Sequence, residues 1–84
     1  MEYPIYHATL SQALDAAINH AANSRASIAQ SEVHEQFSEG LKYEETKQAH
    51  LSIVELKGKA TKKYFHITIY RMSSGTYELT CYIL

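Results

Sequence analysis

The spacing of apolar residues divides the chain into a helical first half and a β-rich second half. In the first half, apolar side chains recur three or four positions apart, at Leu10, Leu14, Ile18, Ala22, Ala26, Ala29, Val33 and Phe37. This period is typical of one face of a helix. The sequence TLSQ at 9–12 is a capping box, and Gly40 follows the last periodic residue. We therefore predict one long helix over about residues 9–39.

The length of this helix leaves an alternative open. A helix of about 30 residues measures about 45 Å, whereas a strand of eight or nine residues spans only about 28 Å. Asn23 and Ser24 both favour helix caps, and SIAQ at 27–30 offers a second capping box. The helix is therefore either continuous or kinked and broken at Asn23–Ser24. An unbroken helix would extend beyond its own sheet and allow a homodimer.

From residue 49 the apolar period changes to two, which is typical of strands with one buried face. Three strands are predicted, at about 49–57, 63–72 and 76–84, with short Gly-containing turns at 58–61 and 73–75. Such short turns favour antiparallel hairpins. We therefore predict a single α+β domain over residues 1–84, with the helix packed on a three-stranded antiparallel β-meander. The segment EYPIYH at 2–7 is a further candidate edge strand, although Pro4 weakens that prediction.

The segment YFHITIYR at 64–71 separates a core face from an outer face. Its apolar set, Phe65, Ile67 and Ile69, matches the apolar set of the last strand, Tyr77, Leu79, Cys81 and Ile83. We expect these two sets to face the helix, because a two-layer domain buries one face of its sheet. The first strand is ambiguous between burial of Leu51 with Ile53 and burial of Val54 with Leu56.

The outer face is the first candidate for partner binding. It carries Tyr64, His66, Tyr70 and Tyr82, and Tyr is enriched in the cores of protein interfaces. One alternative is that these residues only stabilise an exposed sheet, since cross-strand aromatic pairs contribute roughly 0.2–1 kcal/mol each. Another is that the N-terminal segment covers them with Tyr3 or Tyr6.

Charged residues form two further candidate contact sites. Glu32, Glu35 and Glu39 follow one edge of the predicted helix and would suit a basic protein surface. Lys57, Lys59, Lys62 and Lys63 surround the predicted turn at 58–61 and would suit phosphate groups. The net charge of −1 weighs against general affinity for nucleic acid.

No motif of catalysis, metal binding or cofactor binding is present in the sequence. In HEQFS at 34–38, Ser38 stands where a zinc-protease helix has its second His. Cys81 lies on an apolar strand face, where a free Cys usually behaves as a small hydrophobe. A single Cys excludes an internal disulfide and favours a cytoplasmic location, and no apolar run reaches the roughly 20 residues of a membrane span. We therefore expect no catalytic residues, no metal, no cofactor, no membrane association and no enzyme activity.

The favoured interpretation is a small non-enzymatic protein-binding module that occupies a surface of a larger partner. One concrete version is an inhibitor or adaptor from a phage or other mobile element that blocks a host complex, anti-CRISPR-like in kind. It rests on size and on the lack of a recognisable site. The alternative is a single-stranded nucleic-acid-binding domain, in which the Lys-rich hairpin contacts phosphates and the sheet tyrosines stack on bases.

Overall fold

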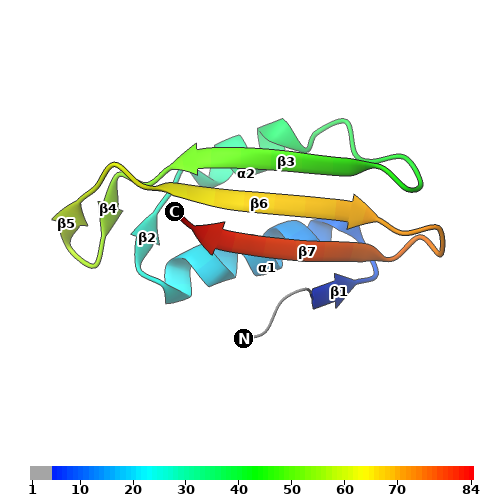
Figure 1. The fold of residues 1–84 in the computed structure, drawn as a ribbon, viewed down its shortest axis with the longest axis horizontal. Helices are drawn as coiled ribbons and strands as arrows, with labels where there is room; N and C mark the ends of the chain where they lie inside the picture. Colours follow the sequence, from blue (N-terminus) through cyan, green and yellow to red (C-terminus); the bar gives the residue numbers. More distant parts are fainter. Residues whose placement is uncertain (1–4) are drawn as a thin grey trace.

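The computed structural model describes residues 5–84, in which two helices lie on one face of an antiparallel sheet (Figure 1). The larger sheet has the strand order β1-β7-β6-β3 and contains β1 (Ile5–His7), β3 (Thr46–Ser52), β6 (Tyr64–Arg71) and β7 (Tyr77–Ile83). A smaller sheet has the order β2-β4-β5 and contains β2 (Ala26–Ser27), β4 (Glu55–Leu56) and β5 (Lys59–Ala60). Helix α1 (Leu10–Asn23) packs on β6 and β7, and α2 (Gln30–Gln36) packs on β3. The predicted α+β class with an antiparallel sheet is confirmed.

The single long helix predicted over residues 9–39 is wrong, because the chain breaks at Asn23–Ser24. Arg25 adopts a left-handed φ of 56°, and its N–H donates to the Ala22 carbonyl at 3.0 Å. Ala26 and Ser27 then pair with β4 in the smaller sheet. A helix of 14 residues is about 21 Å long, close to the roughly 26 Å of an eight-residue strand. Helix α1 therefore ends near the end of the sheet that it covers, and the homodimer expected from an overhanging helix loses its basis.

The two predicted capping boxes have different outcomes. At the start of α1 the Gln12 N–H donates to Thr9 Oγ1 at 3.1 Å, and Gln12 Oε1 accepts from the Ala8 N–H at 3.2 Å. This box is confirmed. The second box is wrong, because α2 begins only at Gln30 and its N-cap, Ala29, makes no side-chain cap hydrogen bond.

Strands β3, β6 and β7 are adjacent and antiparallel as predicted, and β1 adds a fourth strand beside β7. The simple three-stranded meander is not exact, because the β4–β5 hairpin is inserted between β3 and β6, so the turn predicted at 58–61 does not connect these two strands. The predictions for β6 and β7 are confirmed to within one residue at each end. The first predicted strand, 49–57, is displaced, because β3 runs over Thr46–Ser52 and residues 55–56 leave the larger sheet. Those residues pair with β5 through a turn in which Lys57 and Gly58 have φ values of 54° and 83°. Two successive positive φ values are typical of a type I′ hairpin turn.

The edge strand expected near the N-terminus is present at Ile5–His7, which pairs antiparallel with β7. The rest of that prediction, including Tyr3 and Pro4, lies outside the described residues.

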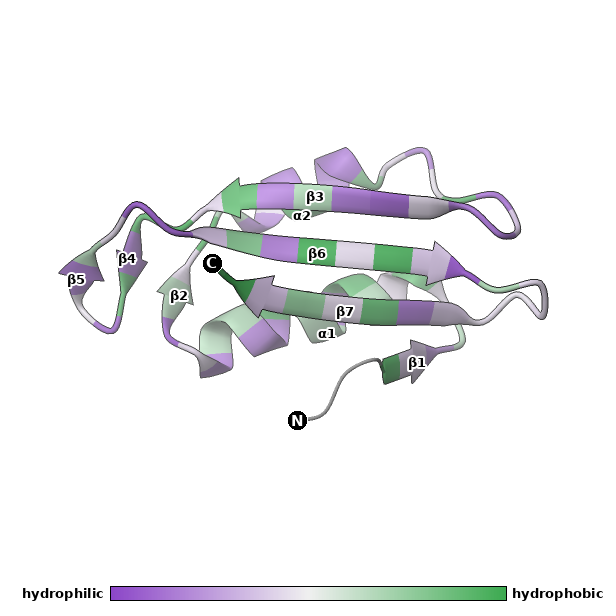
Figure 2. Cartoon of the chain, viewed as in Figure 1, coloured by the Kyte–Doolittle hydropathy of each residue, from purple (hydrophilic) through white to green (hydrophobic). Residues whose placement is uncertain are grey.

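The core lies between the two helices and the inner face of the larger sheet. Figure 2 shows hydrophobic and polar residues alternating along β6 and β7. Phe65, Ile67, Ile69 and Leu79 are each 0% exposed, which confirms the predicted core face. The ambiguity in the first strand is resolved in favour of Leu51 and Ile53, both buried, whereas Val54 is 72% exposed. Helix α1 contributes a buried stripe of Ala13, Leu14, Ala17 and Ala21, and its small side chains permit close approach to the sheet.

Arg71 closes the inner face at the end of β6. Its Nη1 donates to the Leu41 carbonyl at 3.0 Å. Its guanidinium carbon lies 4.1 Å from the ring centre of Tyr43 and 5.4 Å from that of Tyr77, both within the range of a cation–π interaction. These contacts fasten the loop before β3 to the β6–β7 hairpin.

Replacement of Ile67 by Ala tests this core. Ile67 is 0% exposed in the central strand β6, so we expect Ile67→Ala to lower the free energy of unfolding by about 2–5 kcal/mol. Val54→Ala is the matched control, because Val54 is largely exposed, and it should change stability by less than about 0.5 kcal/mol. Urea denaturation followed by circular dichroism measures both. Equal effects in the two variants would contradict the assigned core face.

Candidate binding surface

The outer face of the larger sheet points toward the viewer in Figure 1, and no helix or loop within residues 5–84 lies over it. The strand register arranges its side chains in rows: Tyr6–Glu78–Tyr70–Thr46, Thr80–Thr68–Gln48, Tyr82–His66–His50, and Tyr64–Ser52. Among these residues, Glu78 is the one carboxylate and there is no Lys or Arg. The face is therefore broad, nearly uncharged and rich in Tyr, His and Thr.

Four side chains of this face form an aromatic cluster, defined here as His50, Tyr64, His66 and Tyr82. His66 is central: its ring stacks on Tyr82 with centres 4.6 Å apart and planes 9° apart, and it meets His50 edge-on at 4.5 Å. Tyr64 lies beside it at 6.5 Å. Tyr64 and Tyr82 are each 47% exposed, so the cluster offers flat ring surface to a partner.

The residues predicted for the outer face all lie on it, but they do not form one group. Tyr70 is four residues from His66 along β6, which corresponds to about 13 Å. It lies in the row of Tyr6, Glu78 and Thr46. Tyr64, His66 and Tyr82 are together, and Tyr70 is separate from them.

Two ring-bearing residues of this face, His50 and Tyr6, were not predicted to lie on it. His50 was missed because the register of the first strand was ambiguous, and only its pairing with His66 places it in the cluster. Tyr6, which is 56% exposed, pairs with Glu78 in β1 and so extends the face at its edge rather than covering it.

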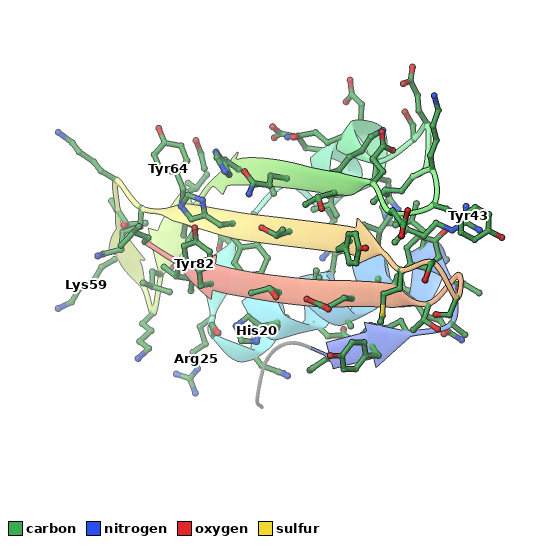
Figure 3. The ribbon with its side chains drawn as sticks, turned by 45° about the vertical axis from the view of Figure 1, so that its right-hand side comes forward. His20, Arg25, Tyr43, Lys59, Tyr64 and Tyr82 are labelled. Atoms are coloured by element: carbon green, nitrogen blue, oxygen red, sulfur yellow. The ribbon has the colours of Figure 1, made fainter. Side chains whose placement is uncertain are left out.

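The four predicted lysines gather beside the aromatic cluster. Lys57 and Lys59 belong to the β4–β5 hairpin, and Lys62 and Lys63 lead directly into Tyr64; all four are exposed. Figures 1 and 3 show this hairpin at the same end of the molecule as Tyr64 and Tyr82. Arg25, which the sequence did not indicate, joins them because its carbonyl accepts from the Lys57 N–H at 3.1 Å. We call these five cationic residues the basic end.

The predicted acidic edge lies on the other side of the sheet. Glu32 and Glu35 are exposed residues of α2, and Glu39 is exposed in the segment that follows it. Helix α2 packs on β3 from the inner side (Figure 1). A partner that lies flat on the outer face would therefore not reach these carboxylates.

The described residues contain no enclosed site. No pocket is present in the surface that residues 5–84 form, and in the same range no three His, Cys, Asp or Glu residues lie together as metal ligands. Cys81 is 4% exposed in the core. Among the described helices, none has the length and apolar character needed to cross a membrane.

Comparison with profiles of known protein families, with curated proteins and with solved structures found no match to this chain.

A shifted pKa is found for His20 of α1, on the inner side of the sheet rather than on the outer face. His20 of α1 stacks on Phe65 with ring centres 5.9 Å apart and planes 28° apart. Desolvation by burial lowers the pKa of His20 from its ordinary value of 6.5, because it disfavours the charged imidazolium. The unfolded chain therefore binds this proton more readily than the folded protein.

This shift predicts a pH dependence of stability. As the pH falls through about 6.5, the unfolded state takes up a proton that the folded state resists, so the free energy of unfolding should decrease. His20→Gln should flatten this slope between pH 7.5 and 5.5, whereas His34→Gln, at an exposed position of α2, should leave it unchanged. Urea titrations across this range measure both slopes. An unchanged slope in His20→Gln would contradict the partial desolvation assigned to this ring.

Proposed function

We propose that this protein is a non-enzymatic binding module that docks the outer face of its larger sheet onto a protein partner. The observation that carries the proposal is the open face itself, with three tyrosines from three strands at 47–56% exposure, namely Tyr6, Tyr64 and Tyr82. Of these, Tyr64 and Tyr82 lie together around His66, and exposed apolar groups that are gathered rather than scattered are typical of interaction sites. The near absence of charge also suits the centre of an interface, where charged residues are depleted.

The aromatic cluster supplies the anchors for this proposal. Tyr and Trp are enriched among the residues that dominate binding energy, and a Tyr side chain loses little conformational freedom when it is buried because it has two rotatable bonds. Stacking on His66 already restricts Tyr82 before any partner arrives, which reduces the entropy lost on binding. An inhibitor or adaptor would use such a surface to occupy a larger complex. It stays a prediction that this role is anti-CRISPR-like in kind. It also stays a prediction that the acidic edge contributes to partner binding.

The double variant Tyr64→Ala with Tyr82→Ala tests the protein-binding proposal. We expect it to lose the partner that the wild-type chain retains in affinity capture from its native cells, because buried Tyr anchors typically cost about 2 kcal/mol or more when truncated. Asp15→Ala, at an exposed position of α1 behind the sheet and outside every candidate site, is the control and should retain the partner. Capture of the same stoichiometric partner by a natively folded double variant would contradict the proposed surface.

A second candidate function is single-stranded nucleic-acid binding, and the position of the basic end favours it. Five cations lie at the end of the molecule where Tyr64 and Tyr82 expose their rings. Stacking on an aromatic side chain contributes about 1–3 kcal/mol per base, while cations that neutralise phosphates contribute a salt-dependent term. The outer face itself carries no Lys or Arg, so the phosphates of a bound nucleic acid would contact the lysines of the β4–β5 hairpin.

Charge reversal at the basic end distinguishes the two candidates. If the chain binds nucleic acid, a labelled single-stranded oligonucleotide should bind at 50 mM salt by fluorescence anisotropy, and Lys59→Glu with Lys62→Glu should abolish binding. Lys42→Glu is the matched control, since it changes an exposed lysine in the loop before β3, at the opposite end of the molecule (Figure 1). A lack of binding by the wild-type protein, or equal loss in the control, would contradict this candidate and leave the protein partner.

A further inference from the structure

His50 and His66 face each other across β3 and β6 on the outer face. The Ile53 N–H donates to the Lys63 carbonyl and the Arg71 N–H donates to the Glu45 carbonyl, so the odd-numbered residues of β3 are the ones that exchange hydrogen bonds with β6. His50 and His66 therefore form a non-hydrogen-bonded pair. In such pairs the Cα atoms are only about 4.5 Å apart and the side chains are closest.

We propose that these two histidines form a binding site for a divalent transition-metal ion of the Ni²⁺, Cu²⁺ or Zn²⁺ class. Each imidazole nitrogen of such a site lies about 2.0–2.1 Å from the ion, which places two ring centres about 5 Å apart. The observed separation of the ring centres is 4.5 Å, with planes inclined by 64°. His50 is exposed, so its ring is free to turn one nitrogen toward the His66 ring, which the proposed site requires.

The surroundings of His66 prepare it for this role. Tyr82 stacks on its ring at 4.6 Å, which limits rotation, and β6 is paired on both sides. Nδ1 of His66 is buried and has no hydrogen-bond partner within the described part of the chain. A buried polar atom without a partner costs free energy, and coordination of this nitrogen, once the exposed His50 ring turns aside to admit the ion, would remove that cost.

The donor set determines which ions fit. Imidazole suits Ni²⁺, Cu²⁺ and Zn²⁺, whereas Mg²⁺ and Ca²⁺ require oxygen ligands. No third His, Cys, Asp or Glu completes the set within residues 5–84, so water fills the remaining positions. The site therefore binds more weakly than a four-ligand structural zinc site. The site lies within the aromatic cluster of the proposed docking surface, but its test uses the protein alone, so the two proposals can fail separately.

Metal-dependent thermal unfolding of the untagged protein tests this site. We expect NiCl₂ to raise the melting temperature of the wild-type chain by several degrees, because a ligand that binds only the folded state stabilises it. EDTA should reverse the rise, and MgCl₂ should produce none. In His50→Gln the Ni²⁺-induced rise should disappear, since a single imidazole binds far more weakly than a pair. The same loss is expected in His66→Gln.

His34→Gln is the matched control, because His34 is exposed on α2 and away from the pair; it should keep the full Ni²⁺-induced rise. Each rise is measured against the metal-free melting temperature of the same variant, so a change in basal stability does not affect the comparison. The proposal is overturned by a wild-type protein that does not respond to Ni²⁺, or by a response that persists in His50→Gln or disappears in His34→Gln.

Discussion

The packing of one 14-residue helix on one face of the four-stranded sheet is the constraint on which the rest of the structure depends. Ala13, Ala17 and Ala21 are almost fully buried, so α1 sits close to β6 and β7. Helix α2 covers β3 on the same side. Within residues 5–84, no helix or loop covers the outer face of the sheet. Every second residue of each strand must therefore tolerate water, and Tyr, His and Thr do so while also pairing across strands.

The same constraint separates three kinds of surface. The outer face is nearly uncharged, the basic end continues from it at the start of β6, and the carboxylates of α2 lie behind the sheet. At the opposite end, Arg71 is fixed between Tyr43 and Tyr77 and to the Leu41 carbonyl. That cation is thus engaged in holding a loop, whereas the lysines of the basic end are exposed. Binding through the outer face and the neighbouring lysines requires no pocket.

Most predictions that rest on residues close together in the sequence were correct, whereas the long helix and the first strand, which depend on contacts between distant segments, were wrong. The core faces of β6 and β7 were correct, because period-two alternation and Gly-containing turns are local signals. The long helix was wrong because Ala26, Val33 and Phe37 stay buried after the break at Asn23–Ser24, so the apolar period continues although the helix does not. The first strand was displaced for a similar reason: Leu56 is partly buried in the hairpin that follows β3, so its apolar pattern resembles an extension of that strand.

The sequence by itself determined the start of α1, the turn between β6 and β7 and the side of these two strands that faces the helices, because each depends on residues close together in the chain. Only the tertiary structure decided that β1 lies beside β7, that His50 stands opposite His66, and that Arg25 joins the lysines of the hairpin. These arrangements depend on backbone hydrogen bonds between segments far apart in sequence. Their register is set by how the whole sheet buries its inner face, and a shift by one residue would turn every outer side chain inward.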